Sequence, residues 1–278
     1  MKDIKEFFRQ DVADLPDFSV FYSVRDSALE GFFMNRELTG QGPKAFEITF
    51  DSLIGWPETR RKNTEILAKY ATECASYFYG NAEFQAAYLM TNGSSLPLKV
   101  VFDTDCAEKA LYLKPFDLTR LIGLELYRMA EAPDYCFLFN DGIIAEEAQE
   151  GKHEFEIDGF NNENYKRGRI RMDIFSFYFG TDDLQKRDNY VVSPERVRII
   201  DFDVATPFSD SEIEAIRRST MQDLNIGEQQ YEEIFAEENQ LFIRRLTKDK
   251  IVGILGLMKT LGLAELGSYI GKKINQSL

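Results

Sequence analysis

Three short strand-like segments followed at once by a helical pattern constrain the fold of this chain more than any other feature. FQAAYLM, LPLKVVF and KALYLKPF read as strands between residues 84 and 116, with a small-residue turn, TNGSS, after the first. LTRLIGLELYRMAE then has the period of a helix. YCFLFND and GIIAEEA follow as two more strands, paired across Asp141-Gly142, a favoured hairpin turn. The sequence therefore predicts a compact α+β unit.

The segments on either side of this unit predict short strands and a helix before it, and mostly helices after it. Before residue 84, FSVFYSV and KAFEITF alternate like strands, and residues 58–80 have a helical period that stops at Gly80. After a polar stretch, RIRMDIFSFYFG predicts a helix, and NYVV and VRIIDF predict a hairpin. The last seventy or so residues read as helices that begin at a Ser-Asp-Ser cap before Glu212. We expect three parts: an N-terminal extension (1–83, largely helical), a small lobe (84–150) and a C-terminal lobe (151–278).

The composition narrows the class of protein and its location. The chain has 278 residues, 44% hydrophobic, and 47 acidic against 33 basic residues give a net charge of −14. Such an acid excess argues against nucleic acid and against an anionic membrane as partners. Three scattered cysteines and an N-terminus without an apolar signal segment favour a cytoplasmic protein, although a bacterial effector exported in the folded state would look the same. Lys259 and Glu265 interrupt the longest apolar stretch, so a transmembrane span is not expected.

Several catalytic classes lack the residues that they need. His153 is the one histidine of the chain, and no G-x-S-x-G nucleophile motif is present, which argues against a Ser-His-Asp hydrolase. GSYIGKK differs from the phosphate-binding P-loop by one missing residue and by the absent hydroxyl. The cysteines are too few for a zinc site built on thiolates.

Glu125 lies on the predicted core-facing side of the helix that begins after Asp117. Glu125 shares the face of Leu118 and Leu121, where an ionised side chain is costly unless a cation pairs with it. Lys114, at the end of the preceding strand, is the nearest candidate partner, and Lys99 is an alternative. A surface glutamate on a broadly apolar helix is the simpler interpretation of the same pattern.

A second polar cluster surrounds the predicted hairpin. RVRIIDFD ends its alternating apolar run at Asp201 and Asp203, and Asn189 precedes the other strand of the hairpin. The hairpin brings Asn189 and Asp201 close together, and an amide oxygen with a carboxylate suits Mg²⁺. A solvated acidic loop with an ordinary turn at the strand end explains each piece taken alone.

The order of these features resembles that of the protein kinase-like superfamily. KPF followed by LIGLELYR, and RDNYVV followed by RIIDFD, carry the likeness over residues 84 to 208. The chain looks most similar to atypical branches such as type II phosphatidylinositol 4-kinases, HipA-like kinases and remote bacterial effector kinases. The resemblance implies a two-lobed fold: a small lobe with an antiparallel sheet and one key helix, and a mostly helical C-terminal lobe.

The resemblance also implies roles for particular residues. Lys114 would contact the phosphates of ATP, and Glu125 would orient it. TNGSS, with Gly93 and Ser94, would stand in for the glycine-rich loop, and the strand that ends near Glu146 and Glu147 would lead to the adenine-binding hinge. Mg²⁺ or Mn²⁺ would be held by three residues: Asn189, Asp201 and Asp203.

The sequence departs from the family pattern at several positions. The catalytic aspartate normally lies five residues before the asparagine, where this chain has Leu184, so Asp183 is the predicted base in a loop one residue longer. Asp182 and Asp188 are rivals for that role. Asp203 replaces the usual glycine of the metal-binding motif, two glycines are missing from the loop around Gly93, and no A-P-E-like segment follows.

These residues predict an ATP- and metal-dependent phosphotransferase acting on a hydroxyl of a protein, a lipid head group or a small molecule. The departures leave a pseudokinase, a nucleotide-binding or purely scaffolding module without catalysis, as the alternative. A phosphoinositide kinase or a transferase of AMP on the same fold is also compatible. In a different class, IVGILGLMKTLGLAELGSYIG near the C-terminus could bind a membrane or a partner, but a buried helix or a helix pair broken near Gly262 is the favoured interpretation.

Overall fold

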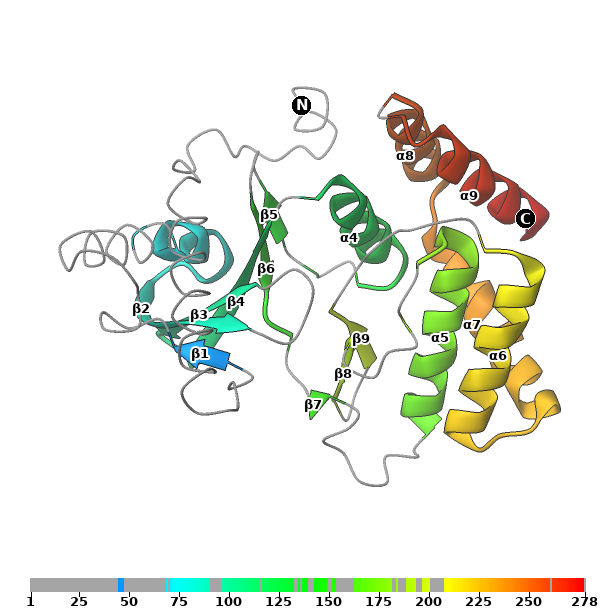
Figure 1. The fold of residues 1–278 in the computed structure, drawn as a ribbon, viewed down its shortest axis with the longest axis horizontal. Coiled ribbons are helices and arrows are strands. Elements are labelled where there is room, and N and C mark those ends of the chain that lie inside the picture. Colours follow the sequence, from blue (N-terminus) through cyan, green and yellow to red (C-terminus); the bar gives the residue numbers. More distant parts are fainter. Residues whose placement is uncertain are drawn as a thin grey trace, which may run out of the picture. The chain divides into compact units, whose positions relative to one another are not determined.

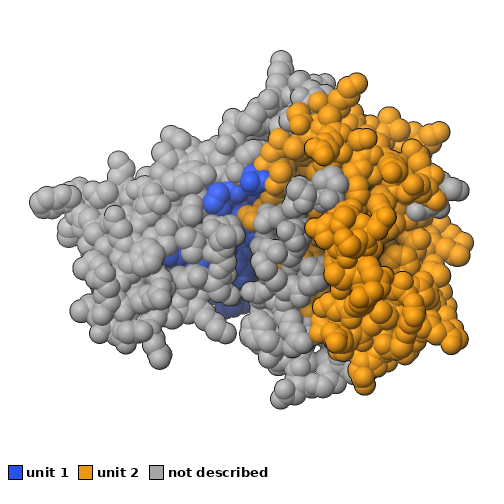
Figure 2. All heavy atoms as spheres, turned by 45° about the vertical axis from the view of Figure 1, so that its right-hand side comes forward, with its two compact units in different colours: residues 1–117, 136–148 blue, residues 118–135, 149–278 orange. Residues whose placement is uncertain are grey.

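The chain forms two compact units in the computed structural model, and Figure 2 colours them separately. Unit 1 consists of residues 1–117 and 136–148, and unit 2 of residues 118–135 and 149–278. The helix after Asp117, expected in the small lobe, belongs to unit 2. The described residues are 45–47, 69, 71–90, 97–115, 117–132, 135, 137–139, 143–149, 152–153, 163–181, 184, 189–193, 197–200, 208–260 and 262–277.

Unit 1 is built on a six-stranded antiparallel sheet (Figure 1). Its strand order is β1-β2-β3-β4-β6-β5, so β6 lies between β4 and β5, and β5 forms an edge of the sheet. The predicted strands of this region and the pairing of its last two strands are confirmed. The bounds are β1 (Ala45–Glu47), β2 (Ala82–Met90), β3 (Leu98–Thr104), β4 (Glu108–Pro115), β5 (Phe137–Phe139) and β6 (Ile143–Glu147).

One face of this sheet packs against a short helical segment. Leu89, Leu98 and Leu111 are fully buried, together with Ala71 and Cys74 of the helical residues 71–79. Each buried leucine contributes roughly 1.5–3 kcal/mol by leaving water. The helix ends as predicted at Gly80, whose φ of +74° suits glycine. The start of that predicted helix and the predicted strand FSVFYSV lie outside the described residues.

Unit 2 combines helices with a small three-stranded sheet of order β7-β8-β9. Helices α6 and α7 both pack against α5 (Figure 1), and the predicted hairpin is β8 with β9. The fold class is thus α+β, as predicted. The bounds are α4 (Leu118–Ala130), β7 (Lys152–His153), α5 (Glu163–Phe179), β8 (Tyr190–Val192), β9 (Val197–Ile199), α6 (Asp210–Leu224), α7 (Glu228–Arg245), α8 (Lys248–Thr260) and α9 (Ala264–Ser277).

The predicted cap of α6 is present. The Ser209 hydroxyl accepts the Glu212 backbone N–H at 3.3 Å, and the Glu212 carboxylate accepts the Ser209 N–H at 2.7 Å. This reciprocal pair is a capping box, which satisfies N–H groups that a helix start leaves without partners. The same bonds lower the pKa of Glu212.

The C-terminal apolar stretch forms the helix pair that the sequence favoured. Helices α8 and α9 pack together around Gly262, whose φ is +79°. A Cβ added to Gly267 would lie 3.4 Å from Met258, and one added to Gly271 would lie 3.4 Å from Leu255, so an alanine at either position would contact the other helix at van der Waals distance. Among the helices of the described ranges, none is long and apolar enough to cross a membrane.

Candidate functional site

The buried lysine of unit 1 is paired with a glutamate of the neighbouring strand. Lys114 Nζ donates to Glu146 Oε2 at 3.1 Å, and the side chains are 7% and 2% exposed. Lys114 lies opposite Ile144 in the register of β4 and β6. Glu146 is two residues farther along β6, on the same face, which makes the two a diagonal cross-strand pair. The sequence named Glu146 only as part of a hinge.

Glu125 has a cation within its own helix. Arg128 donates to both carboxylate oxygens, through Nε at 2.7 Å and Nη2 at 2.6 Å, in a two-pronged pair three residues apart. Glu125 is 8% exposed, so the predicted burial of this carboxylate is correct. Because Lys114 belongs to unit 1 and Glu125 to unit 2, their predicted pairing stays a prediction.

The hairpin holds the start of β8 against the end of β9. The Ile200 N–H donates to the carbonyl of Asn189 at 3.0 Å, and the next pair in the register is Tyr190 with Ile199. Asn189 therefore lies beside the residue that immediately precedes Asp201 in the sequence. Asp201 itself lies outside the described residues, so the predicted convergence of the two side chains on one ion stays a prediction.

A hydrogen bond joins the outer edge of the hairpin to α4. Strand β9 is an edge strand of its sheet, and the Ile199 N–H on that edge donates to the hydroxyl of Tyr127 at 3.2 Å. The Tyr127 ring also makes edge-to-face contacts with Tyr135 and Phe175, both at 5.8 Å between centroids. Burial raises the pKa of Tyr127 to about 12, so the hydroxyl stays neutral. Helix α4 and the hairpin are thus parts of one packed body.

A glycine on α5 allows the hairpin to approach that helix closely. A Cβ at Gly168 would lie 2.5 Å from Cγ2 of Val197 in β9, a distance that real Cβ atoms do not reach. At the next residue of α5, the Arg169 guanidinium lies 4.8 Å from the centre of the Tyr190 ring in β8. Both strands of the hairpin are therefore set by contacts to α5.

The remaining predicted site residues divide between the described and the undescribed parts of the chain. Glu147 ends β6, opposite Leu111 of β4. The other predicted residues of the phosphate loop, the catalytic loop and the metal motif lie outside the described residues: Gly93, Ser94, Asp182, Asp183, Asp188, Asp201 and Asp203.

Of the three predicted metal ligands, the described residues include Asn189 alone, so the metal site stays a prediction. Within the described residues, no three side chains of His, Cys, Asp or Glu gather closely enough to hold an ion. Asn189 supplies an amide oxygen at the hairpin end, and two aspartates of the predicted set follow that end in the sequence. Oxygen donors of this kind fit Mg²⁺ or Mn²⁺.

Sequence reasoning missed a buried carboxyl that joins three helices. Asp173 of α5 accepts hydrogen bonds from Thr220 of α6 and Tyr231 of α7, both at 2.9 Å. Burial raises the pKa of Asp173 to about 7, although Arg169 and the two hydroxyl donors act in the opposite direction. The available signal was a carboxylate on the apolar stripe of RIRMDIFSFYF, the same kind of signal that singled out Glu125.

A second buried carboxyl lies at the end of α4. The pKa of Glu131 is raised to about 7 by burial, against the opposing effect of Arg171 and Arg245. Arg245 Nη1 donates to its Oε2 at 3.4 Å. Glu131 therefore links α4 to α5 and α7, in addition to the link that Tyr127 makes with β9.

Comparison with known proteins does not assign the chain to a family. The chain matches no protein-family model, and no curated protein is significantly similar to it.

Proposed function

We propose that the chain is an ATP- and divalent-metal-dependent phosphotransferase of the kinase-like kind, acting on a hydroxyl group. The observation that supports this proposal is the order of elements around Lys114. A β2–β3 hairpin precedes the strand that carries the buried lysine, and a helix with a buried glutamate follows it. After β5 and β6, α5 leads to the Asn189 hairpin and then to the aspartates at 201 and 203. This is the context in which such a lysine, glutamate, asparagine and aspartate act together.

The roles follow from the charge and position of each group. Lys114 supplies a buried ammonium for phosphate oxygens, and Glu146 holds its side chain in place. Asn189 and Asp201 would hold Mg²⁺ or Mn²⁺, with Asp203 as a further ligand. The ion would neutralise charge on the transferred phosphoryl group. Asp183 would accept the proton of the acceptor hydroxyl.

A thermal-shift titration with ATP and Mg²⁺ or Mn²⁺ tests the proposal. At a hundredfold excess over the dissociation constant, binding adds about 2.7 kcal/mol to the stability of the folded state. We expect a metal-dependent shift in the wild type and its loss in Asp201→Ala. Asp249→Ala is the matched control, because Asp249 is an exposed aspartate in the first turn of α8. Transfer of labelled phosphate to casein or histone, or hydrolysis of ATP, then separates catalysis from binding.

A scaffold without catalysis is the second candidate, because two glycines are missing from the loop around Gly93, the predicted catalytic loop is one residue longer than in the family, and Asp203 replaces a glycine. Nucleotide binding without transfer, in the wild type and in Asp183→Ala alike, would support this candidate. The absence of any shift with ATP and either metal would contradict the phosphotransferase and favour a scaffold that binds no nucleotide.

A further inference from the structure

The end of α4 carries a buried carboxyl that the proposed phosphotransfer does not use. Glu131 follows Ala130, the last residue of that helix, and its side chain is 9% exposed. Its Oε1 atom is buried, and no described residue donates a hydrogen bond to it. A buried carboxylate oxygen without a donor is costly when the group is ionised. The position of Glu131 therefore favours the protonated carboxyl.

The cations beside Glu131 offset only part of this cost. Arg245 Nη1 lies 3.4 Å from Oε2, and its side chain is 39% exposed, so the ion pair is weak. Arg171 Nε lies 3.9 Å from the same oxygen and 3.8 Å from Glu238, so two carboxylates share it. Glu238 also receives a closer hydrogen bond from Arg167, at 2.9 Å. Glu131 is thus the less neutralised of the two carboxyls, and burial raises its pKa to about 7.

The direction of α4 disfavours ionisation as well. The C-terminal end of a helix is the negative end of its dipole, so a carboxylate beside the last turn is repelled. In that turn the Tyr127 carbonyl accepts the N–H of Glu131 at 2.8 Å and the N–H of Ala132 at 3.1 Å. The Tyr127 hydroxyl accepts the Ile199 N–H of β9. Tyr127 therefore joins the turn at Glu131 to the hairpin.

We propose that Glu131 is a proton-controlled latch on the last turn of α4. With a proton bound, the side chain stays buried beside α5 and α7, and the turn remains closed. When the carboxyl ionises, its charge is better solvated in water, so the side chain moves out, the turn opens and the bond between Tyr127 and Ile199 loosens. The described charged groups that face the latch are Arg167 and Arg171 of α5 and Glu238 and Arg245 of α7.

Proton linkage gives the direction of the effect. The Glu131 carboxyl has a pKa of about 7 in the closed turn and an ordinary value of 4.5 in the solvated, open turn. Between these values the closed turn holds a proton that the open turn has lost. Opening therefore becomes about tenfold more frequent for each pH unit from about pH 5 to about pH 7. Below this interval the latch is fully closed, and above it the frequency of opening stays constant.

Amide hydrogen exchange of the full-length protein from about pH 5 to about pH 8 tests the latch directly. After correction for intrinsic exchange, protection of the Glu131, Ala132 and Ile199 amides should fall about tenfold per pH unit up to about pH 7 and then level off. The Leu263 amide is the internal control, because it donates to Met258 at 2.8 Å in the equivalent turn that follows α8. Its protection should change much less. Constant or rising protection at Glu131 and Ala132 would overturn the proposal, and an unresponsive Ile199 amide would refute the link to the hairpin.

A pair of variants tests whether Glu131 is the group that titrates. Glu131→Gln keeps the shape of the side chain but cannot ionise, so protection of the Ala132 amide should no longer depend on pH over this range. The matched control is Glu233→Gln, which removes the same charge from an exposed position on α7 and should retain the wild-type profile. Circular dichroism would verify that both proteins are folded. A pH dependence that persists in Glu131→Gln would refute the assignment.

A titration of the wild type provides a readout that needs no variant. Carbon-13 NMR of the glutamate side-chain carboxyls follows the ionisation of each group as the pH is raised. The Glu131 carboxyl should titrate with a midpoint near pH 7, against about 4.5 for an exposed glutamate. A midpoint for Glu131 below about pH 5 would overturn the proposal. Because no nucleotide is present in these experiments, their outcome is independent of the proposed phosphotransfer.

Discussion

The hydroxyl of Tyr127 accepts the backbone N–H of Ile199 at 3.2 Å, in a buried contact between α4 and β9. Tyr127 lies two residues after Glu125, and Ile199 lies two residues before Asp201. One hydrogen bond therefore ties the helix of one predicted site residue to the strand that leads to another. Helix α4 and the hairpin both belong to unit 2.

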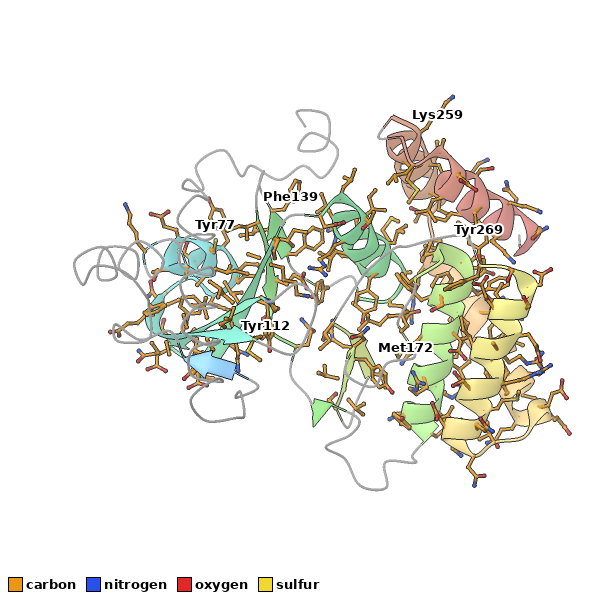
Figure 3. All side chains as sticks on the ribbon, viewed as in Figure 1. Tyr77, Tyr112, Phe139, Met172, Lys259 and Tyr269 are labelled. Atoms are coloured by element: carbon orange, nitrogen blue, oxygen red, sulfur yellow. The ribbon has the colours of Figure 1, made fainter. Side chains whose placement is uncertain are left out.

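Removal of that hydroxyl should destabilise the protein without repacking the core. In Tyr127→Phe, the aromatic contacts to Tyr135 and Phe175 remain, but the Ile199 N–H is left buried without its acceptor. The expected cost is about 1–3 kcal/mol in the free energy of unfolding by urea. Tyr77→Phe is the control, because Tyr77 (labelled in Figure 3) is 60% exposed. Equal stability of Tyr127→Phe and the wild type would show that the bond contributes nothing.

The buried Lys114–Glu146 pair predicts a large difference between single and double variants. Lys114→Met leaves a buried carboxylate without its cation, which should cost about 3–5 kcal/mol. Lys114→Met with Glu146→Leu should recover most of that loss. The exposed pair of Lys69 with Glu73, at 3.8 Å, is the comparison, and Lys69→Met should change the free energy of unfolding by less than about 1 kcal/mol. A double variant no more stable than Lys114→Met would contradict the assignment.

Asp173 predicts a pH dependence with a definite sign. Its pKa is about 7 in the folded protein against an ordinary value of 3.8, so above pH 4 the unfolded chain loses this proton first. Stability is then fully present below about pH 4 and declines as the pH rises to 7, by up to about 1.4 kcal/mol per unit. Glu131 contributes a second decline of the same sign. Asp173→Asn should therefore reduce the slope of melting temperature against pH, whereas Asp249→Asn should leave it unchanged.

The contact of Gly168 with Val197 predicts opposite effects for two Gly→Ala changes. Gly168→Ala places a Cβ where Val197 now lies, and overpacking of this kind costs about 1–3 kcal/mol. Gly256→Ala, on an exposed face of α8 with no atom within 4 Å of the new Cβ, should stabilise by about 0.5–1 kcal/mol. Val197→Ala should rescue Gly168→Ala in part. A neutral Gly168→Ala would mean that the hairpin can shift away freely.

Local signals explain why much of the fold could be predicted. Ser209 and Glu212 are the two ends of a capping box, and Gly80 and Gly262 have the positive φ angles that end helices. Alternation predicted the strands of unit 1, because side chains on one face of a strand share one environment. All these features depend on residues a few positions apart, so the sequence displays them directly.

The partners of charged residues could not be predicted in the same way. Lys114 and Glu146 are 32 residues apart, and their pairing depends on the register of β4 and β6. The ion pair of Glu125 with Arg128, three residues along the same helix, was not predicted either. The hydrogen bonds of Asp173 result from the packing of three helices, so no local pattern indicates them. The division of the chain after Asp117 likewise depends on tertiary contacts.

The last helix contributes contacts to α5 that a shortened chain would lose. Tyr269 of α9 (labelled in Figure 3) donates its hydroxyl to the carbonyl of Phe177 at 2.8 Å, in the final turn of α5, where carbonyls lack partners within the helix. Lys273 lies over the Phe177 ring. A protease cut or a truncation before residue 264 would remove both contacts from the helix that leads toward Asn189. Fragments intended for assay or crystallisation therefore need to extend through Lys273.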